Sequence, residues 1–306
     1  MLRRNTGRCH ATQYLAGFFT FVLLLVGLMH CATASAGKNQ MDAGTRMALV
    51  IGNGEYNIAP LKNPVNDARA MSDSLRSLGF EVTLEENGTL REMIESIRAF
   101  SLASRKSKVR LFYYAGHGFQ LSGKNYLLPV DTEATTIAEL SNKSVDINEL
   151  LQRLQNMEGG VNLVILDACR THPYLSMLPV GRGVRGLGTS NGLAQVMAPK
   201  GTLIAFSTAP NSIANDGNAQ NSTYTKYLLS YISSPGLPIE QLLKRVRIAV
   251  AEETRDAQIP WESSSLTGDF CFKPGPNGRC MFVDSEYLAP TALPQIMEGV
   301  TRGHKR

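Results

Sequence analysis

Two residues with reactive side chains stand directly after apolar stretches of the sequence. His117 lies within Tyr-Ala-Gly-His-Gly, and Cys169 lies within Asp-Ala-Cys-Arg. A cysteine needs a base or a positive neighbour to act as a thiolate near neutral pH. A histidine can supply either, and it can later protonate a leaving amine. The backbone N–H groups of Gly118 and Cys169 are then candidates to stabilise a developing oxyanion.

Each of these residues also has a plainer interpretation. A lone cysteine after an apolar strand is most often a small core residue, and a lone histidine is most often structural. In open parallel sheets, however, sites form where the carboxyl ends of strands meet the loops that follow. The position of His117 and Cys169 just past two predicted strand ends therefore favours a shared site.

Apolar residues alternate between strand-like and helix-like spacing over most of the chain. We expect strands at 47–51, 80–84, 109–115, 161–166 and 202–207, and helices at 66–78, 89–102, 146–157, 223–232 and 239–254. This alternation predicts an α/β fold, in which a mainly parallel sheet is flanked by helices on both faces. Residues 132–145 are expected to be a polar connection, and 171–200 a long loop. Trp261 is expected in the core or at a pocket rim.

The first 36 residues have the composition of an export signal. A polar and basic start is followed by an uncharged apolar run at 14–29 and then by small residues that include Ala34-Ser35-Ala36. That order predicts a secretory signal peptide over residues 1–36. The alternative is an uncleaved membrane anchor formed by 14–29, although this run is short of the ~20 residues that a spanning helix needs. We therefore expect an exported protein, periplasmic or secreted, which contacts a membrane only if the segment is retained.

Export changes the interpretation of the five cysteines. Cys9 and Cys31 fall within the signal, which leaves three cysteines in an oxidising compartment. Cys271 and Cys280 bracket the turn-rich stretch FKPGPNGR, so we expect a disulfide between them. Cys169 is then an unpaired thiol, and such a thiol in an exported protein calls for a reason.

Composition and charge argue against a disordered chain and against a nucleic-acid partner. Apolar residues make up 43% of the chain and charged residues 19%, as in a folded globular protein. The formal charge is +5, and three of the basic residues lie within the acid-free first 36 positions. The remaining excess is too small to indicate a nucleic-acid partner. The sequence has no phosphate-binding GxxxxGK[ST] motif, so a nucleotide is not expected either.

Together these motifs resemble the caspase-like cysteine peptidases (peptidase C14, clan CD), and most closely their bacterial metacaspase or orthocaspase branch. The stretches that carry the resemblance occur in the family's order: ALVIGNGEY, LKNPVNDARAM, YAGHG, GKNYLLPVD, DACR, GTLIAFSTAP and QIPWESSSLTGDF. The resemblance covers about residues 46–273 and implies the caspase–hemoglobinase fold. It implies a peptidase domain at 46–284, divided into a large-subunit-like part at 46–177, a loop at 178–200 and a small-subunit-like part at 201–284, with a tail at 285–306.

The resemblance also implies roles for individual residues. Cys169 is the expected nucleophile and His117 the acid–base of a dyad, because no acid that would orient His117 is evident. Asp67 and Asp167 are expected to line the pocket for the residue before the scissile bond, where two carboxylates would attract Arg or Lys. The alternatives are a helix N-cap for Asp67 and a structural hydrogen bond at the sheet end for Asp167.

These inferences together predict an exported cysteine endopeptidase that cuts protein or peptide substrates after Arg or Lys. No cofactor or metal is expected, because calcium-activated metacaspases carry acids soon after the nucleophile and RTHPYLSML, which begins with Arg170, carries none. One departure from the family is Ala115, where many metacaspases have Ser. The main alternative is a catalytically silent caspase-like interaction or signalling module at the cell envelope. A thiol–disulfide exchanger is a weaker one, because the sequence has no Cys-x-x-Cys.

Overall fold

The computed structural model describes residues 45–157, 159–168, 193–210, 212 and 219–281. The chain divides into Met1–Ala43 and Gly44–Arg306, and every described residue belongs to the second part. Four expectations lie outside the described residues: the signal segment 1–36, the nucleophile Cys169, most of the loop 178–200, and the tail 285–306.

Six strands form one sheet in the order β2-β1-β3-β7-β8-β9. They are β1 (Arg46–Gly52), β2 (Phe80–Glu86), β3 (Val109–Ala115), β7 (Val161–Asp167), β8 (Thr202–Phe206) and β9 (Trp261–Ser264). The first five run parallel, and β9 pairs antiparallel with β8 at the edge. The five strands expected from the apolar runs are thus confirmed. Trp261 is 42% exposed on the edge strand rather than in the core.

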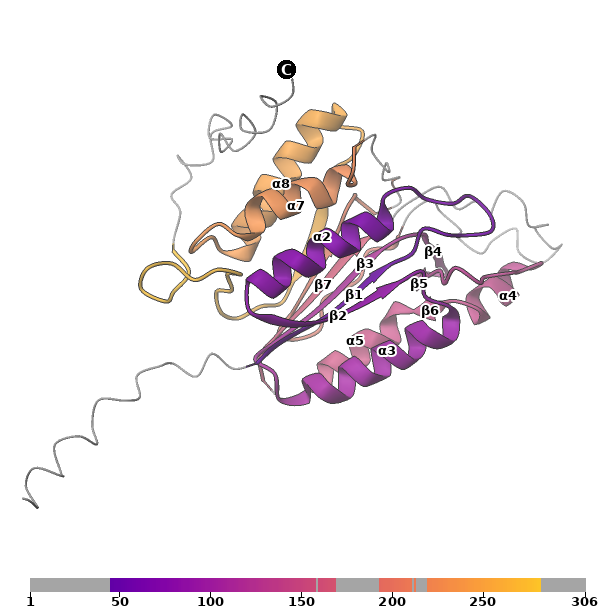
Figure 1. Ribbon diagram of the computed structural model, residues 1–306, viewed down its shortest axis with the longest axis horizontal. Helices are drawn as coiled ribbons and strands as arrows, with labels where there is room; N and C mark the ends of the chain where they lie inside the picture. Colours follow the sequence, from indigo (N-terminus) through magenta and orange to yellow (C-terminus); the bar gives the residue numbers. More distant parts are fainter. Residues whose placement is uncertain (1–44, 158, 169–192, 211, 213–218, 282–306) are drawn as a thin grey trace, which may run out of the picture. The chain divides into compact units, whose positions relative to one another are not determined.

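Helices cover both faces of this sheet (Figure 1). One face carries α2 (Pro64–Ser77), α7 (Thr223–Ile232) and α8 (Ile239–Thr254), and the other carries α3 (Leu90–Ala103) and α5 (Ile147–Gln155). Because both faces are covered, β3 is buried along its whole length. Its side chains alternate between the two cores: Tyr113 packs with the α2 side and Tyr114 with the α3 side. The expected fold class is confirmed.

A second, smaller sheet follows His117 and was not predicted. It consists of β4 (Gly118–Leu121), β5 (Lys124–Leu127) and β6 (Val145–Asp146), in antiparallel pairs. The stretch 132–145, expected as a polar connection, contains the short helix α4 (Ile137–Asn142). Thr136 caps α4 by accepting a hydrogen bond from the Glu139 N–H at 3.1 Å. The helix is too short for its two buried side chains to produce a periodic pattern. A short 3₁₀ turn, η1 (Ser104–Lys106), follows α3.

Cys271 and Cys280 form a disulfide, with their Cα atoms 5.6 Å apart. The loop that it closes is tied to the connection between α7 and α8. The Gly236 N–H donates to the Lys273 carbonyl at 2.7 Å, and the Met281 N–H donates to the Gly236 carbonyl at 2.7 Å. These two hydrogen bonds therefore anchor the loop that the disulfide closes to the connection between α7 and α8.

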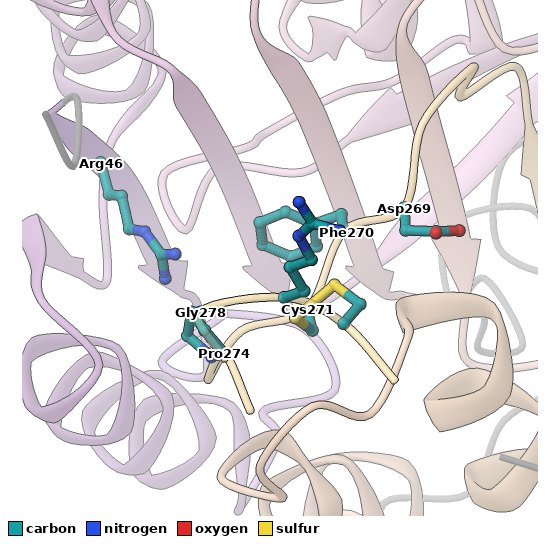
Figure 2. A pocket seen from close by; sticks show the side chains of 8 residues that line it. Arg46, Asp269, Phe270, Cys271, Pro274 and Gly278 are labelled. Carbon is teal, nitrogen blue, oxygen red and sulfur yellow. A yellow bond between two sulfur atoms is a disulfide. The ribbon is translucent and has the colours of Figure 1, made fainter. Parts of the chain in front are cut away.

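A cavity of about 620 Å³ lies beside this disulfide (Figure 2). Arg46, the first residue of β1, and Phe270 are among the residues that line it. The Arg46 guanidinium donates a hydrogen bond to the Phe272 carbonyl at 2.7 Å. Because Arg46 begins a parallel strand, the cavity lies at the amino-terminal edge of the sheet, opposite the edge at which β3 leads into His117. It is therefore not part of the site expected from the sequence. Among the described residues, no helix has the length and apolar character needed to cross a membrane.

The disulfide predicts a defined loss of stability when it is removed. Replacing both cysteines (Cys271→Ser with Cys280→Ser) frees a short loop in the unfolded chain, which should lower the free energy of unfolding by about 2–3 kcal/mol. Urea unfolding followed by circular dichroism measures the change. Wild-type protein in a reducing agent should unfold at the midpoint of the double variant. A midpoint that the double substitution leaves unchanged would show that the disulfide does not constrain the loop.

Candidate active site

His117 lies at the carboxyl edge of the sheet, between β3 and β4, and is only 3% exposed. Its Nε2 lies 2.8 Å from the carbonyl oxygen of Ala59, in the loop that follows β1. A carbonyl oxygen can only accept a hydrogen bond, so Nε2 carries the hydrogen. Nδ1 is then the ring nitrogen that can take up a proton.

The loop that presents the Ala59 carbonyl is held in an unusual conformation. Ala59 has a φ of 53°, a left-handed geometry that disfavours a residue with a Cβ by about 1 kcal/mol or more. Two asparagines fix the start of this loop. The Asn53 side chain accepts from the Gly88 N–H at 3.0 Å, and Asn87 accepts from the Gly54 N–H at 2.9 Å. Such strain persists only where the surroundings determine the backbone, and it is frequent at functional sites.

Two tyrosine hydroxyls hold the main chain of His117. The His117 N–H donates to Tyr56 Oη at 2.9 Å, and Tyr114 Oη donates to the His117 carbonyl at 2.8 Å. The Tyr56 ring also packs on the imidazole, with ring centroids 4.5 Å apart. Gly116, with a φ of 155°, makes room for this arrangement, because a Cβ there would lie 2.6 Å from both hydroxyls. These contacts restrain both the backbone and the ring of His117.

The strand ends that precede His117 and Cys169 are adjacent in the sheet. Strand β3 pairs with β7, and Ala115 is the register partner of Asp167. Cys169 lies outside the described residues, but Ala168 before it is fully buried beside Gly118. A Cβ built on Gly118 would lie 3.4 Å from the Ala168 Cβ and 3.2 Å from the Tyr126 carbonyl, so Gly118 is closely packed against both segments.

Asp67 and Asp167 are both fully buried, and they lie close enough for the charge of one to act on the other. Asp167 ends β7, and Asp67 lies inside α2. The N-cap of α2 is Asn63, so an N-cap role for Asp67 is wrong. The structure thus brings together the two acids that the sequence analysis placed in one pocket.

Ser222, the N-cap of α7, connects the two acids. Its N–H donates to Asp67 Oδ1 at 3.0 Å, and its hydroxyl donates to Asp167 Oδ2. Each of these oxygens has a second donor: Asn221 Nδ2 reaches Asp67 Oδ1 at 2.9 Å, and Thr225 Oγ1 reaches Asp167 Oδ2 at 2.9 Å. The start of α7 therefore holds one oxygen of each carboxylate.

The other oxygen of each carboxylate is buried without a partner. Asp67 Oδ2 and Asp167 Oδ1 have no hydrogen bond within the part of the chain that the structure describes. A buried polar atom without a partner costs about 1–3 kcal/mol, and more when it is charged. A cation that brings N–H donors, such as a guanidinium group, would supply the missing bonds to both oxygens.

Burial, and after it the nearby charge of Asp167, together raise the pKa of Asp67 from 3.8 to about 7. The pKa of Tyr113 is raised well above its ordinary value by burial and then by the charges of Asp67 and Asp167. Near neutral pH, Asp67 is therefore divided between its protonated and ionised forms. Within the described residues, no group of three or more His, Cys, Asp or Glu side chains could hold a metal ion.

Several residues of this site were not identified from the sequence. Ser222 precedes a predicted helix start, which is an N-cap signal, but that signal does not indicate what else the side chain binds. Thr225 lies within the same helix and carries no signal of its own. The role of Ala59 belongs to its backbone carbonyl, which every residue type has, so no sequence pattern could identify it.

Comparisons with known proteins give the family. Residues 45–271 match the family model of the peptidase C14 caspase domain, so the chain belongs to the caspase-domain family. The human mucosa-associated lymphoid tissue lymphoma translocation protein 1 is 33% identical over 158 residues, which cover 51% of this chain and 19% of that protein. Horse caspase-1 is 23% identical over 250 residues, covering 76% of this chain and 60% of that protein. The matches thus span less than two thirds of either relative.

Solved structures show the same fold. Caspase-1 from Spodoptera frugiperda superposes with a TM-score of 0.57 at 19% identity, covering 79% of this chain and 96% of that chain. The resemblance to caspase-like cysteine peptidases is therefore confirmed. Membership of the metacaspase branch stays a prediction.

The raised pKa of Asp67 predicts a pH dependence of stability. The folded protein binds this proton more tightly than the unfolded chain does, because folding raises the pKa from 3.8 to about 7. The stability that Asp67 contributes is therefore greatest below pH 3.8 and is lost as the pH rises to about 7. Urea unfolding at several pH values should show the wild-type stability, relative to Asp67→Asn, falling across this window.

The variant Asp167→Asn provides the matched comparison. It keeps Asp67 buried but removes the neighbouring charge, so the folded-state pKa of Asp67 should fall, and the pH window over which stability is lost should end at a lower pH. A wild-type stability that runs parallel to that of Asp67→Asn at every pH would contradict this account of the pair.

Proposed function

We propose that this protein is a cysteine endopeptidase that hydrolyses peptide bonds after Arg or Lys. The observation that carries the proposal is the pair of buried oxygens without partners, Asp67 Oδ2 and Asp167 Oδ1. Asp167 ends the strand next to β3, which leads into His117. Membership of the caspase-domain family supports the peptidase class.

The acid pair favours a basic residue before the scissile bond. A guanidinium group presents N–H donors in a planar fork that suits two carboxylate oxygens, and an ammonium group offers a compact charge with three donors. An aspartate side chain would bring a further negative charge into a buried site that already contains two acids. That like-charge contact disfavours cleavage after Asp.

The proposed chemistry uses His117 and Cys169 in sequence. His117 Nδ1 takes the thiol proton of Cys169, and the thiolate sulfur attacks the carbonyl carbon of the scissile bond. The N–H groups of Gly118 and Cys169 bind the resulting oxyanion. His117 then gives its proton to the leaving amine nitrogen as the C–N bond breaks, and water hydrolyses the thioester with His117 again as base. The Ala59 carbonyl accepts the Nε2–H throughout and so steadies the imidazolium.

The location and partners of the protein are also proposals. The basic start, apolar run and small residues of 1–36 support export, with anchoring in a membrane only if 14–29 is retained. The proposed partners are protein or peptide substrates, without nucleic acid and without a metal or other cofactor.

Peptide hydrolysis tests the proposed function directly. Protein that begins at Gly37 is given fluorogenic peptides that end in Arg, Lys or Asp, under reducing conditions. We expect cleavage after Arg and Lys only, and a fall in kcat/KM of at least about 10³-fold in Cys169→Ala and in His117→Ala.

Two other results would contradict the proposal. Cleavage after Asp would be consistent with Cys169 as the nucleophile but would contradict the role proposed for the acid pair. Absence of turnover for every peptide, with and without calcium, would favour a catalytically silent caspase-like module.

The titration of Asp67 predicts a pH dependence of substrate binding. Its pKa is about 7 before substrate binds, and the ionised pair attracts a cation more strongly than the singly protonated pair does. KM for the Arg peptide should therefore fall as the pH rises from 6 to 8. In Asp67→Asn, KM should be at least about 30-fold higher and should lack this trend. A wild-type KM that does not change with pH would show that Asp67 does not contribute to substrate binding.

A further inference from the structure

Asp167 stands at the end of a chain of buried hydroxyl groups that the proposed mechanism does not use. Thr225 Oγ1 donates to Asp167 Oδ2 at 2.9 Å, and Tyr113 Oη lies 2.6 Å from Thr225 Oγ1. A threonine hydroxyl has one hydrogen, which Thr225 gives to Asp167, so Tyr113 must donate to Thr225. All three side chains are fully buried. The hydrogen bonds therefore run in one direction, from Tyr113 through Thr225 to Asp167.

The first turn of α7 supplies both donors to this carboxylate oxygen. Besides Thr225, the hydroxyl of Ser222 donates to Asp167 Oδ2, and Ser222 Oγ in turn accepts the Thr225 N–H at 3.1 Å. Hydrogen bonds to an ionised acceptor are about twice as strong as neutral ones, and successive hydroxyl donors reinforce one another. Two such bonds on Oδ2 restrain rotation of the carboxylate, so Oδ1 stays the oxygen without a partner among the described residues.

We propose that Thr225 is a positioning residue for substrate specificity, whose hydroxyl, backed by Tyr113, fixes the Asp167 carboxylate so that Oδ1 binds the substrate's cation. The inference rests on the proposed function and deepens it. A guanidinium bound by a planar fork needs a fixed carboxylate, whereas an ammonium group, a point charge on a flexible stem, tolerates a rotated one. Thr225 therefore favours Arg over Lys.

The test compares Thr225→Val, which removes the hydroxyl at nearly constant volume, with Thr225→Ser, which keeps it. In Thr225→Val, KM for the Arg peptide should rise about tenfold, KM for the Lys peptide should rise less, and kcat should change little. Thr225→Ser should restore the wild-type preference for Arg. Tyr113→Phe, which removes only the first donor of the chain, should shift the same ratio in the same direction by a smaller factor.

Thr202→Val is the matched control. Thr202 is another fully buried threonine, at the start of β8 and so at the opposite edge of the sheet, and its hydroxyl accepts a hydrogen bond from Asn162 at 3.3 Å. Its removal should leave both KM values unchanged. Thermal unfolding of every variant identifies any that do not fold. If Thr225→Val does not fold, the Arg/Lys ratio of Tyr113→Phe tests the role of the hydroxyl chain instead.

The outcomes distinguish a failure of the role proposed for Thr225 from a failure of the proposed function. Wild-type cleavage after Arg and Lys, with an unchanged Arg/Lys ratio in Thr225→Val and Tyr113→Phe, overturns the role of Thr225 alone. An equal loss of kcat for both peptides also overturns it, because that result indicates a general structural role. If the wild-type protein cleaves neither peptide, the proposed function fails, and the role of Thr225 fails with it.

Discussion

The burial of two carboxylates in one hydrogen-bonded network, without a cation beside them in the described residues, is the constraint on which the rest of this site depends. Asp67 and Asp167 repel each other where water cannot screen them, and one oxygen of each has no partner. The start of α7, together with Asn221 before its N-cap, offsets part of that cost through four donors from Asn221, Ser222 and Thr225. Partial protonation of Asp67 near neutral pH offsets more of it. Under the proposed function, an arriving cation would offset the remaining deficit.

The same acid pair draws on both halves of the chain. Asp67 and Asn221 are 154 positions apart in the sequence, yet their side chains are hydrogen-bonded. The parallel sheet makes this possible, because β3 and β7 end side by side and α2 and α7 cover the same face. On the neighbouring strand end, the Ala59 carbonyl and two tyrosine hydroxyls hold His117. The acid pair and the imidazole thus both lie at the carboxyl edge of the six-stranded sheet.

Much of this arrangement could be predicted from the sequence, because it depends on apolar periodicity and on where strands end. The five parallel strands and the main helices belong to that part. The placement of Asp67 with Asp167 was instead implied by the resemblance to the caspase-like peptidases and does not follow from periodicity. Helix α4 could not be predicted, because one and a half turns with two buried residues leave no periodic pattern. Ala59 acts through its backbone, and Thr225 acts through a contact between distant segments, so neither leaves a local signal. A prediction from sequence fails here where the function belongs to tertiary contacts rather than to residue types.

The most direct test of the central claim is to let the protein choose its own cleavage sites. An unfolded proteome is digested with wild-type protein and with Cys169→Ala, and mass spectrometry identifies the new amino termini. The account predicts that Arg, and less often Lys, precedes the new termini that only the wild-type protein produces. Cuts that follow Asp, or that show no preference for a basic residue, would contradict the claim that the buried acid pair selects the substrate.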